Sequence, residues 1–217
     1  MFITFEGPEG SGKSENARHL AAWLAARGVA VTSTREPGGT TLGEQVRALL
    51  LDPARAPSAL TSLLLFSASR AELVRQVIRP ALVAGRVVIC DRYTDSTLAY
   101  QGYGDGLALE DIRSLNRLAT GGLTPDLTYL LDVPVEVGLA RRAGAGDWNG
   151  IDARDRAFHQ RVREGFLALA RMEAVRFRVI DASMCRDQVQ DAMLTALPAP
   201  LRESGPPVPN SQGTWKA

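Results

Sequence analysis

The 217-residue sequence has little of several features that mark other classes of protein. No apolar run approaches the ~20 residues of a membrane-spanning helix, so no membrane partner is expected. The two cysteines and two histidines (Cys90, Cys185, His19 and His159) are not spaced as a zinc site requires. A net charge of +1 gives no electrostatic reason to expect a nucleic-acid partner. The opening MFITFEG does not resemble a secretory signal, so a reducing, cytoplasmic location is expected.

Lysine is also scarce. Of the 25 basic residues, only Lys13 and Lys216 are lysine, and the others are arginine. An ammonium group is a compact point charge and a guanidinium is a flat fork, so the two are not interchangeable at a binding site. Position 13 is therefore a candidate for a site that needs the ammonium itself, with chance as the alternative.

Apolar β-type runs alternate with stretches of helical period along the chain. Strands are expected at Phe2–Glu6, Val29–Thr34, Arg86–Asp91, Leu127–Asp132 and Arg176–Asp181. Helices are expected at Lys13–Arg27, Leu42–Leu51, Ala59–Ala84, Leu109–Leu118, Val135–Arg142, Asp152–Met172 and Arg186–Leu197. This alternation predicts βαβ units. The predicted fold class is therefore α/β, with three layers and a five-stranded parallel sheet flanked by helices.

The domain boundaries follow from composition. Residues 1–197 are expected to form one domain, because their length and apolar content suit a single core. The segment Pro198–Ala217 contains five prolines together with Gly, Ser and Asn, which is typical of a disordered tail.

A phosphate-binding loop follows the first predicted strand. Its residues are Gly7, Pro8, Glu9, Gly10, Ser11, Gly12, Lys13 and Ser14, which match the pattern G-x-x-x-x-G-K-[ST] and lead into a helix. Backbone N–H groups of such a loop and of the first helical turn bind phosphate oxygens. Lys13 is expected to bridge the terminal phosphates, and the Ser14 hydroxyl to bind Mg²⁺. A glycine-rich turn without a ligand is the alternative, and the strand–helix context disfavours it.

Two further polar segments end predicted strands, where ligands of such sheets bind. Asp91 is placed to hold Mg²⁺ through water, and Arg92 to contact both the donor and the acceptor phosphates. A strand-end salt bridge is the alternative for this pair. Arg35, Glu36 and Pro37 begin a loop, REPGGTT, that suits a phosphate group.

An aromatic ring and a guanidinium share one face of the long helix, since Phe66 and Arg70 are four residues apart. Such a pair can stack on a base and hydrogen-bond its edge. The alternative is that Phe66 belongs to the core and Arg70 is a solvated charge. Tyr100 and Gln101 lie in a segment that reads as a loop too polar for the core.

Six motifs in one order give the chain a family resemblance. GPEGSGKS, REPGGT, LLLFSASRAELV, DRYTDSTLAYQG, YLLDVPVEVGLARR and FHQRVREGF together resemble the bacterial thymidylate kinases, from about Phe2 to Leu197. The resemblance implies transfer of the γ-phosphoryl group of ATP to dTMP with Mg²⁺. It also implies a homodimer formed through helices around Leu60–Leu73.

The resemblance implies a role for each matching residue. Lys13 and Arg92 match the phosphoryl ligands, and Asp91 the strand-end acid. Glu9 matches the loop carboxylate near the acceptor phosphate and metal, so that Ser14, Asp91 and Glu9 form the expected metal set. The expected dTMP residues are Arg35, Glu36 and Pro37 at the phosphate, Phe66 stacked on thymine, Arg70 at the base edge, Thr97 and Gln101 beside the base, and Tyr100 beneath the deoxyribose.

The chain departs from the family pattern at two places. Glu15 stands where the family usually has a threonine that helps hold the α-phosphate. The lid, expected at about residues 142–154, lacks several of the usual basic positions. Arg141 or Arg142 is then expected to supply the lid charge, with Arg154 and Arg156 as alternatives. The alternative is that Arg141 and Arg142 have no role in the lid and are cations at a helix C-terminus that interact favourably with the helix dipole.

Two rival functions stay open at this point. A deoxynucleoside kinase also combines a phosphate loop with an Asp-Arg pair, but its hydroxyl acceptor needs a carboxylate base, and REPGGT argues for a phosphate acceptor. A non-catalytic nucleotide-binding protein is the other rival, supported only by the departures at Glu15 and in the lid.

Overall fold

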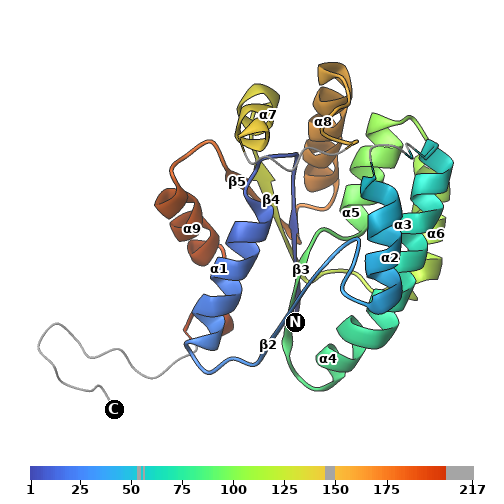
Figure 1. The fold of residues 1–217 in the computed structure, drawn as a ribbon. Coiled ribbons are helices and arrows are strands. Elements are labelled where there is room, and N and C mark those ends of the chain that lie inside the picture. Colours follow the sequence, from blue (N-terminus) through green and yellow to red (C-terminus); the bar gives the residue numbers. More distant parts are fainter. Residues whose placement is uncertain (53–54, 56, 145–149, 204–217) are drawn as a thin grey trace, which may run out of the picture.

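The computed structural model describes residues 1–52, 55, 57–144 and 150–203. Five strands form one sheet in the order β2-β3-β1-β4-β5, and every neighbouring pair is parallel. The strands are β1 (Phe2–Glu6), β2 (Val31–Arg35), β3 (Val87–Asp91), β4 (Leu127–Asp132) and β5 (Phe177–Asp181). The predicted α/β class, with a five-stranded parallel sheet between helices, is confirmed (Figure 1).

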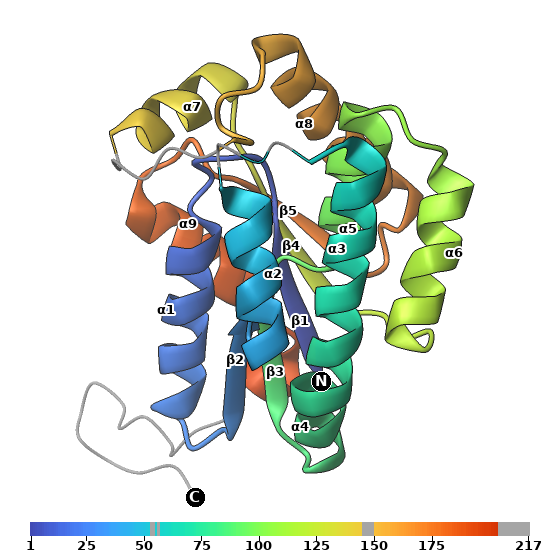
Figure 2. The ribbon, with the colours of Figure 1, turned by 45° about the vertical axis from the view of Figure 1, so that its right-hand side comes forward.

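Helices connect the strands and cover both faces of the sheet (Figures 1 and 2). They are α1 (Lys13–Ala25), α2 (Thr41–Leu51), α3 (Ala59–Leu73), η1 (Val74–Ile78), α4 (Arg79–Val83), α5 (Thr94–Thr97), η2 (Leu98–Gly104), α6 (Leu109–Thr120), α7 (Val135–Ala143), α8 (Arg156–Met172), α9 (Arg186–Thr195) and α10 (Ala199–Arg202). The label η marks a π-helical turn. No helix in the described part of the chain has the length and apolar character needed to cross a membrane.

Side chains of the central strands alternate between two cores. In β1, Ile3 and Phe5 pack with α1 and α9, whereas Phe2 packs on the other face with η1 and α4. In β3, Ile89 faces the first core and Val88 the second. Successive strand residues point to opposite faces, and here both faces are covered. This double burial explains why the strand sequences read as continuous apolar runs.

The segment after β3 overturns one prediction. Residues 94–104 form α5 and η2 instead of a polar loop, and Tyr100 and Gln101 are each only 5% exposed. The Tyr100 ring packs near Phe158 and Phe166 of α8 with centroid distances of 6.3 and 6.0 Å. Its hydroxyl bonds to charged partners inside the molecule. The Tyr100 hydroxyl is therefore paired although it is buried. The composition of this segment alone does not reveal these distant partners.

The C-terminal boundary also differs from the expectation. The described chain continues past Leu197 into the short helix α10, and Leu201 packs against the core beneath α1 and α9. Within the predicted lid, residues 145–149 lie outside the described residues, as do residues 204–217 of the predicted tail.

A buried ion pair fastens α5 to the edge of the sheet. Arg176, just before β5, donates to both carboxylate oxygens of Asp95 at 2.7 and 2.8 Å, and Asp95 is 1% exposed. We expect Asp95→Ala to lower the free energy of unfolding by about 1–3 kcal/mol, because Arg176 loses two charge-assisted hydrogen bonds but keeps its contacts with Glu173 and Thr128. Urea denaturation measures this loss.

The exposed pair between Glu110 and Arg117, 3.7 Å apart, supplies the matched control. Glu110→Ala should change stability by about 0–1 kcal/mol, since exposed ion pairs contribute little. Equal losses from the two substitutions would contradict the structural role assigned to Asp95.

Candidate active site

A cleft of about 660 Å³ opens at the carboxyl ends of the strands. Its walls come from the loop after β1, the start of α1, the loop after β2, α3, η2, the end of α7 and the segment before α9. Doubly wound sheets bind their ligands at this edge. Most of the side chains singled out from the sequence line it, although they are spread over much of the chain.

The phosphate loop forms the floor of the cleft. Gly12 has a left-handed backbone, with φ of 84°, and precedes α1 as its N-cap. At Gly10, φ is 68° and an added Cβ would lie 2.0 Å from the carbonyl oxygen of Gly138 in α7. Only glycine fits this close approach. The loop is therefore held between β1 and α7 with the free N–H groups of α1 at its end.

The ammonium of Lys13 is held back inside this loop. Its Nζ donates to the carbonyl oxygen of Pro8 at 2.7 Å and to Ser11 Oγ at 3.3 Å, and the residue is buried. Burial and then repulsion from Arg92 lower the pKa of Lys13 to about 8. A bound polyphosphate would restore full charge to an ammonium that burial and Arg92 destabilise.

The expected metal ligands Ser14 and Asp91 meet directly. The Ser14 hydroxyl donates to Asp91 Oδ2 by a short hydrogen bond. No group of three or more His, Cys, Asp or Glu side chains suited to a metal occurs among the described residues. Mg²⁺ ordinarily takes few protein ligands, keeps several waters and uses the oxygens of substrate phosphates. A hydroxyl beside one carboxylate at the end of a phosphate loop fits that preference.

Arg92 connects the two halves of the cleft. Its Nη1 donates to the carbonyl oxygen of Gly7 at 3.2 Å and to Ser96 Oγ at 3.1 Å. Its Nη2 donates to Glu9 Oε1 at 2.8 Å and to the Tyr100 hydroxyl at 3.1 Å. Arg92 is the one described non-glycine residue with a positive φ, 71°. Such backbone strain persists where the surrounding structure fixes it, often at functional sites.

The Glu9 carboxylate stays charged in this setting. Burial raises its pKa, but attraction to Arg92 and Lys13 and a hydrogen bond from Tyr100 outweigh it and bring the pKa down to about 2. The Tyr100 hydroxyl donates to Glu9 Oε1 at 2.7 Å, and burial raises the pKa of Tyr100 well above its usual range. The alternative for Asp91 and Arg92 was a salt bridge at the end of the strand. Arg92 does form a salt bridge, but with Glu9 of the phosphate loop.

Glu6, at the end of β1, is a functional residue that the sequence reasoning missed. Its two oxygens accept from the Tyr93 backbone N–H at 2.7 Å and from Ser96 Oγ at 2.6 Å. Burial and the nearby Asp95 raise the pKa of Glu6 to about 8. Glu6 thereby fixes the turn that carries Arg92. A carboxylate directly before the first loop glycine is a signal that could have pointed to it.

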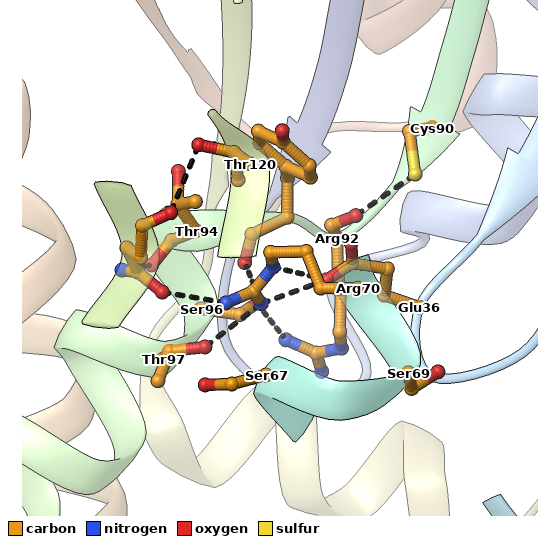
Figure 3. Close-up of polar contacts among 12 residues, drawn as sticks. Glu36, Ser67, Ser69, Arg70, Cys90, Arg92, Thr94, Ser96, Thr97 and Thr120 are labelled. Carbon is orange, nitrogen blue, oxygen red and sulfur yellow. Dashed lines mark hydrogen bonds and ion pairs between the residues drawn. The ribbon is translucent and has the colours of Figure 1, made fainter. Parts of the chain in front are cut away.

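Arg70 lies at the centre of a hydrogen-bond network (Figure 3). It is 1% exposed, and its guanidinium donates to Glu36 Oε2 at 2.8 Å, Asn116 Oδ1 at 2.7 Å and Thr97 Oγ1 at 2.8 Å. Burial lowers the pKa of Arg70, but the attraction of Glu36 outweighs it and raises the pKa overall. The alternative of a solvated charge is wrong, because the side chain lines the cleft from inside the protein.

The remaining expected acceptor residues also line the cleft: Arg35, Glu36, Pro37, Phe66, Thr97 and Gln101. Phe66 is half-buried and belongs to none of the core clusters found among the described residues, which favours a ring at the cleft wall over a core position. Arg35 pairs with Glu44 at 2.9 Å and is half exposed. Arg47 was missed in the sequence. It donates to the Pro37 carbonyl at 3.0 Å and joins Arg35 on the same wall, because α2 folds back beside the loop.

The four candidate lid arginines divide into two pairs. Arg141 and Arg142 line the cleft, where Arg141 donates to the Ala182 carbonyl at 2.7 Å and Arg142 pairs with Asp152 at 3.0 Å. Arg154 instead pairs with Asp105, and Arg156 with Glu136.

Comparison with known proteins identifies the family. A family model described as thymidylate kinase matches residues 5–193. A curated thymidylate kinase of Deinococcus radiodurans is 52% identical over 91% of this chain and 96% of its own length. One of Desulfovibrio desulfuricans is 52% identical over 94% and 98%. The chain belongs to the thymidylate kinase family. A crystal structure of thymidylate kinase from Ehrlichia chaffeensis superimposes with a TM-score of 0.72 at 37% identity, over 90% of this chain and 97% of that one.

The lowered pKa of Lys13 predicts that nucleotide binding is linked to protons. Above pH 8 the free protein has largely lost this proton, and a bound triphosphate would raise the pKa and take the proton back up. We therefore expect ATP binding to weaken as the pH rises through about 8 and to take up protons there. Calorimetric titrations in buffers of different ionisation enthalpy measure the uptake.

The Lys13→Arg variant is the control, because arginine does not titrate in this range. It separates Lys13 from Glu6, whose pKa is also raised to about 8. Proton uptake of equal size in the wild type and in this variant would contradict the assignment to Lys13.

Proposed function

We propose that this chain transfers the γ-phosphoryl group of ATP to dTMP, giving ADP and dTDP, with Mg²⁺. The observation that carries the proposal is the position of Arg92. One guanidinium reaches from Gly7 and Glu9 of the phosphate loop to the Tyr100 hydroxyl of η2. A cation in that position can neutralise charge on both a donor and an acceptor phosphate.

The chemistry needs little beyond position and charge. The oxygen of a nucleoside monophosphate is already anionic near neutral pH, so no side chain has to remove a proton from it. Catalysis then consists of holding two polyanions in line and offsetting their charge. Lys13 and Arg92 are assigned this role at the transferred group. Glu9 is assigned to hold Arg92 beside the acceptor.

Mg²⁺ would be held by Ser14 and by Asp91 through water, with Glu9 on the acceptor side of the same set. When bound, the ion neutralises charge on the phosphate oxygens. Ser14 and Asp91 are already in contact, so their oxygens are oriented before any ligand arrives.

The acceptor wall supports dTMP as the substrate. Arg35, Glu36 and Pro37, with Arg47 behind them, supply the phosphate end of the wall. Phe66 is assigned to stack on thymine and Arg70 to hydrogen-bond the base edge, with Thr97 and Gln101 beside it. Tyr100 is assigned to lie beneath the deoxyribose. Its ring is packed on α8 and its hydroxyl is bonded, so it leaves little freedom for an extra sugar hydroxyl.

We further propose a homodimer that acts in the cytoplasm. Helix α3 exposes Leu60 and Leu64 at 57% and 52%, and the adjoining α2 exposes Leu42 and Leu49. Figure 2 shows these two helices side by side. An apolar face of this kind suits a second copy of the chain. Sedimentation equilibrium tests the dimer, and a monomer at micromolar concentration would contradict it.

One assay tests the function against its rivals. ADP release is measured with Mg·ATP and, in turn, dTMP, thymidine, dUMP, UMP and CMP. We expect dTMP to be the preferred acceptor. Preference for thymidine would indicate a deoxynucleoside kinase, and absence of turnover with every acceptor would indicate a non-catalytic protein.

Arg92→Ala should lower kcat by at least ~10²-fold, because a charge is removed from the transition state. Steady-state kinetics with dTMP measure the effect, and circular dichroism must stay native. A change confined to KM would show that Arg92 binds ground and transition states equally.

Tyr100 is expected to make the enzyme select deoxyribonucleotide acceptors over ribonucleotide acceptors. The wild type should reject UMP much more strongly than dUMP, and Tyr100→Phe should keep most of this preference because the ring remains. Tyr100→Ala should narrow the gap between the two kcat/KM values. Equal use of UMP and dUMP by the wild type would contradict the role.

Between the two arginines of α7, we assign Arg142 to the transferred phosphate. Arg142 pairs with Asp152, and its charge also contributes to lowering the pKa of Glu9, whereas Arg141 points to the Ala182 and Ser183 carbonyls. Arg142→Ala should cost about 2–4 kcal/mol of transition-state stabilisation, as one lost donor to developing charge does. Arg141→Ala should chiefly raise KM for ATP. The reverse pattern would move the assignment to Arg141.

A further inference from the structure

Glu15 places a negative charge at the entrance of the phosphate loop. It lies in the first turn of α1, directly after Lys13 and Ser14, and it lines the cleft. An acidic side chain there interacts favourably with the helix dipole of α1. The same charge repels a polyphosphate that approaches the N-terminus of that helix. Glu15 therefore favours the empty protein and disfavours the loaded one.

A cation from another helix meets this carboxylate. Arg186 Nε lies 2.9 Å from Glu15 Oε1, and the two side chains are 66% and 46% exposed. Arg186 is the first residue of α9 and also lines the cleft. A cation at the first position of a helix interacts unfavourably with its dipole. Arg186 therefore does not stabilise α9 through the helix dipole. Its contact with Glu15 points instead to a role of Arg186 at the cleft.

The segment before α9 is built to hold Arg186 at that place. Ala182 is buried in the main core, and Arg141 donates to the carbonyl oxygens of Ala182 and Ser183 at 2.7 and 3.5 Å. Met184 and Val189 line the same wall. Arg186 therefore projects from a fixed wall over the start of α1, where the donor nucleotide has to enter.

We propose that Arg186 is a positioning residue for the donor nucleotide. Arg186 binds Glu15 and offsets its negative charge, so that the polyphosphate can enter the loop. The identity of the donor, ATP, rests on the proposed function. The pair is too exposed to add much to folding, since exposed ion pairs contribute little to stability. Its effect is expected in nucleotide binding, where several negative charges meet one carboxylate.

The test is a set of calorimetric titrations that need no turnover. A non-hydrolysable ATP analogue, adenosine and dTMP are titrated into the wild type and into Arg186→Ala. The variant should bind the ATP analogue roughly tenfold more weakly, equivalent to about 1.4 kcal/mol. Its affinity for adenosine and for dTMP should stay within about twofold, because neither brings a polyphosphate to the start of α1.

A double-mutant cycle then asks whether Arg186 acts through Glu15. In a Glu15→Thr background, Arg186→Ala should change the affinity for the ATP analogue by less than about threefold, because the carboxylate to be offset is gone. Arg117→Ala is the matched control, since it removes the same charge from the remote helix α6 and should leave all three affinities unchanged.

Several outcomes would overturn the proposal. An equal loss of affinity in both backgrounds would show that Arg186 contacts the nucleotide itself. An equal loss for adenosine would place Arg186 at the base, and no loss at all would make the pair a surface contact only. Because binding is measured without reaction, a wild type that binds the ATP analogue but does not phosphorylate dTMP would contradict the proposed function and leave this test valid.

Discussion

The anchoring of the Arg92 guanidinium is the constraint on which the cleft depends. A cation that is proposed to contact two phosphates works best when it is already held in place before they bind, and here four oxygens hold it. Its backbone adopts a positive φ, which costs free energy and needs support. Glu6 gives that support from β1, by accepting from the Tyr93 N–H and from Ser96. Two acidic side chains thus hold this part of the site: Glu9 pairs with the guanidinium, and Glu6 fixes the turn that carries it.

A second buried pair gives the acceptor wall its shape. Arg70 and Glu36 are 1% and 5% exposed, and Asn116, Thr97 and the Tyr93 carbonyl also accept hydrogen bonds from the guanidinium. Burying two charges is costly unless they are paired, and here the guanidinium is paired and bonded, although Glu36 Oε1 accepts no hydrogen bond in the described part of the chain. The network links the loop after β2 to α3, α5 and α6. The side of the cleft that is proposed to bind the base is therefore held by contacts between segments that lie far apart in the sequence.

The donor side is organised differently. Its charges, Glu15, Arg18 and Arg186, are exposed, and water screens them. Lys13 is buried there, and its pKa is lowered because burial and then repulsion from Arg92 disfavour the charged ammonium. The buried Arg70 network and the exposed entrance to the phosphate loop suit the two different ligands that are proposed for this cleft, dTMP and ATP.

The sequence by itself determined the sheet, the phosphate loop and most of the cleft residues. The alternation of apolar runs with helical stretches, the GxxxxGKS pattern and the position of Asp91 and Arg92 at a strand end are local patterns. Local patterns can be recognised from the sequence without knowledge of the fold. The contacts of Arg92 with Glu9 and of Arg186 with Glu15 were decided by tertiary structure alone. The two residues of these pairs are 83 and 171 positions apart, and the sequence around one residue does not predict its contact with the other. Tyr100 shows the same limit, because a polar segment became buried only when α8 supplied its aromatic partners.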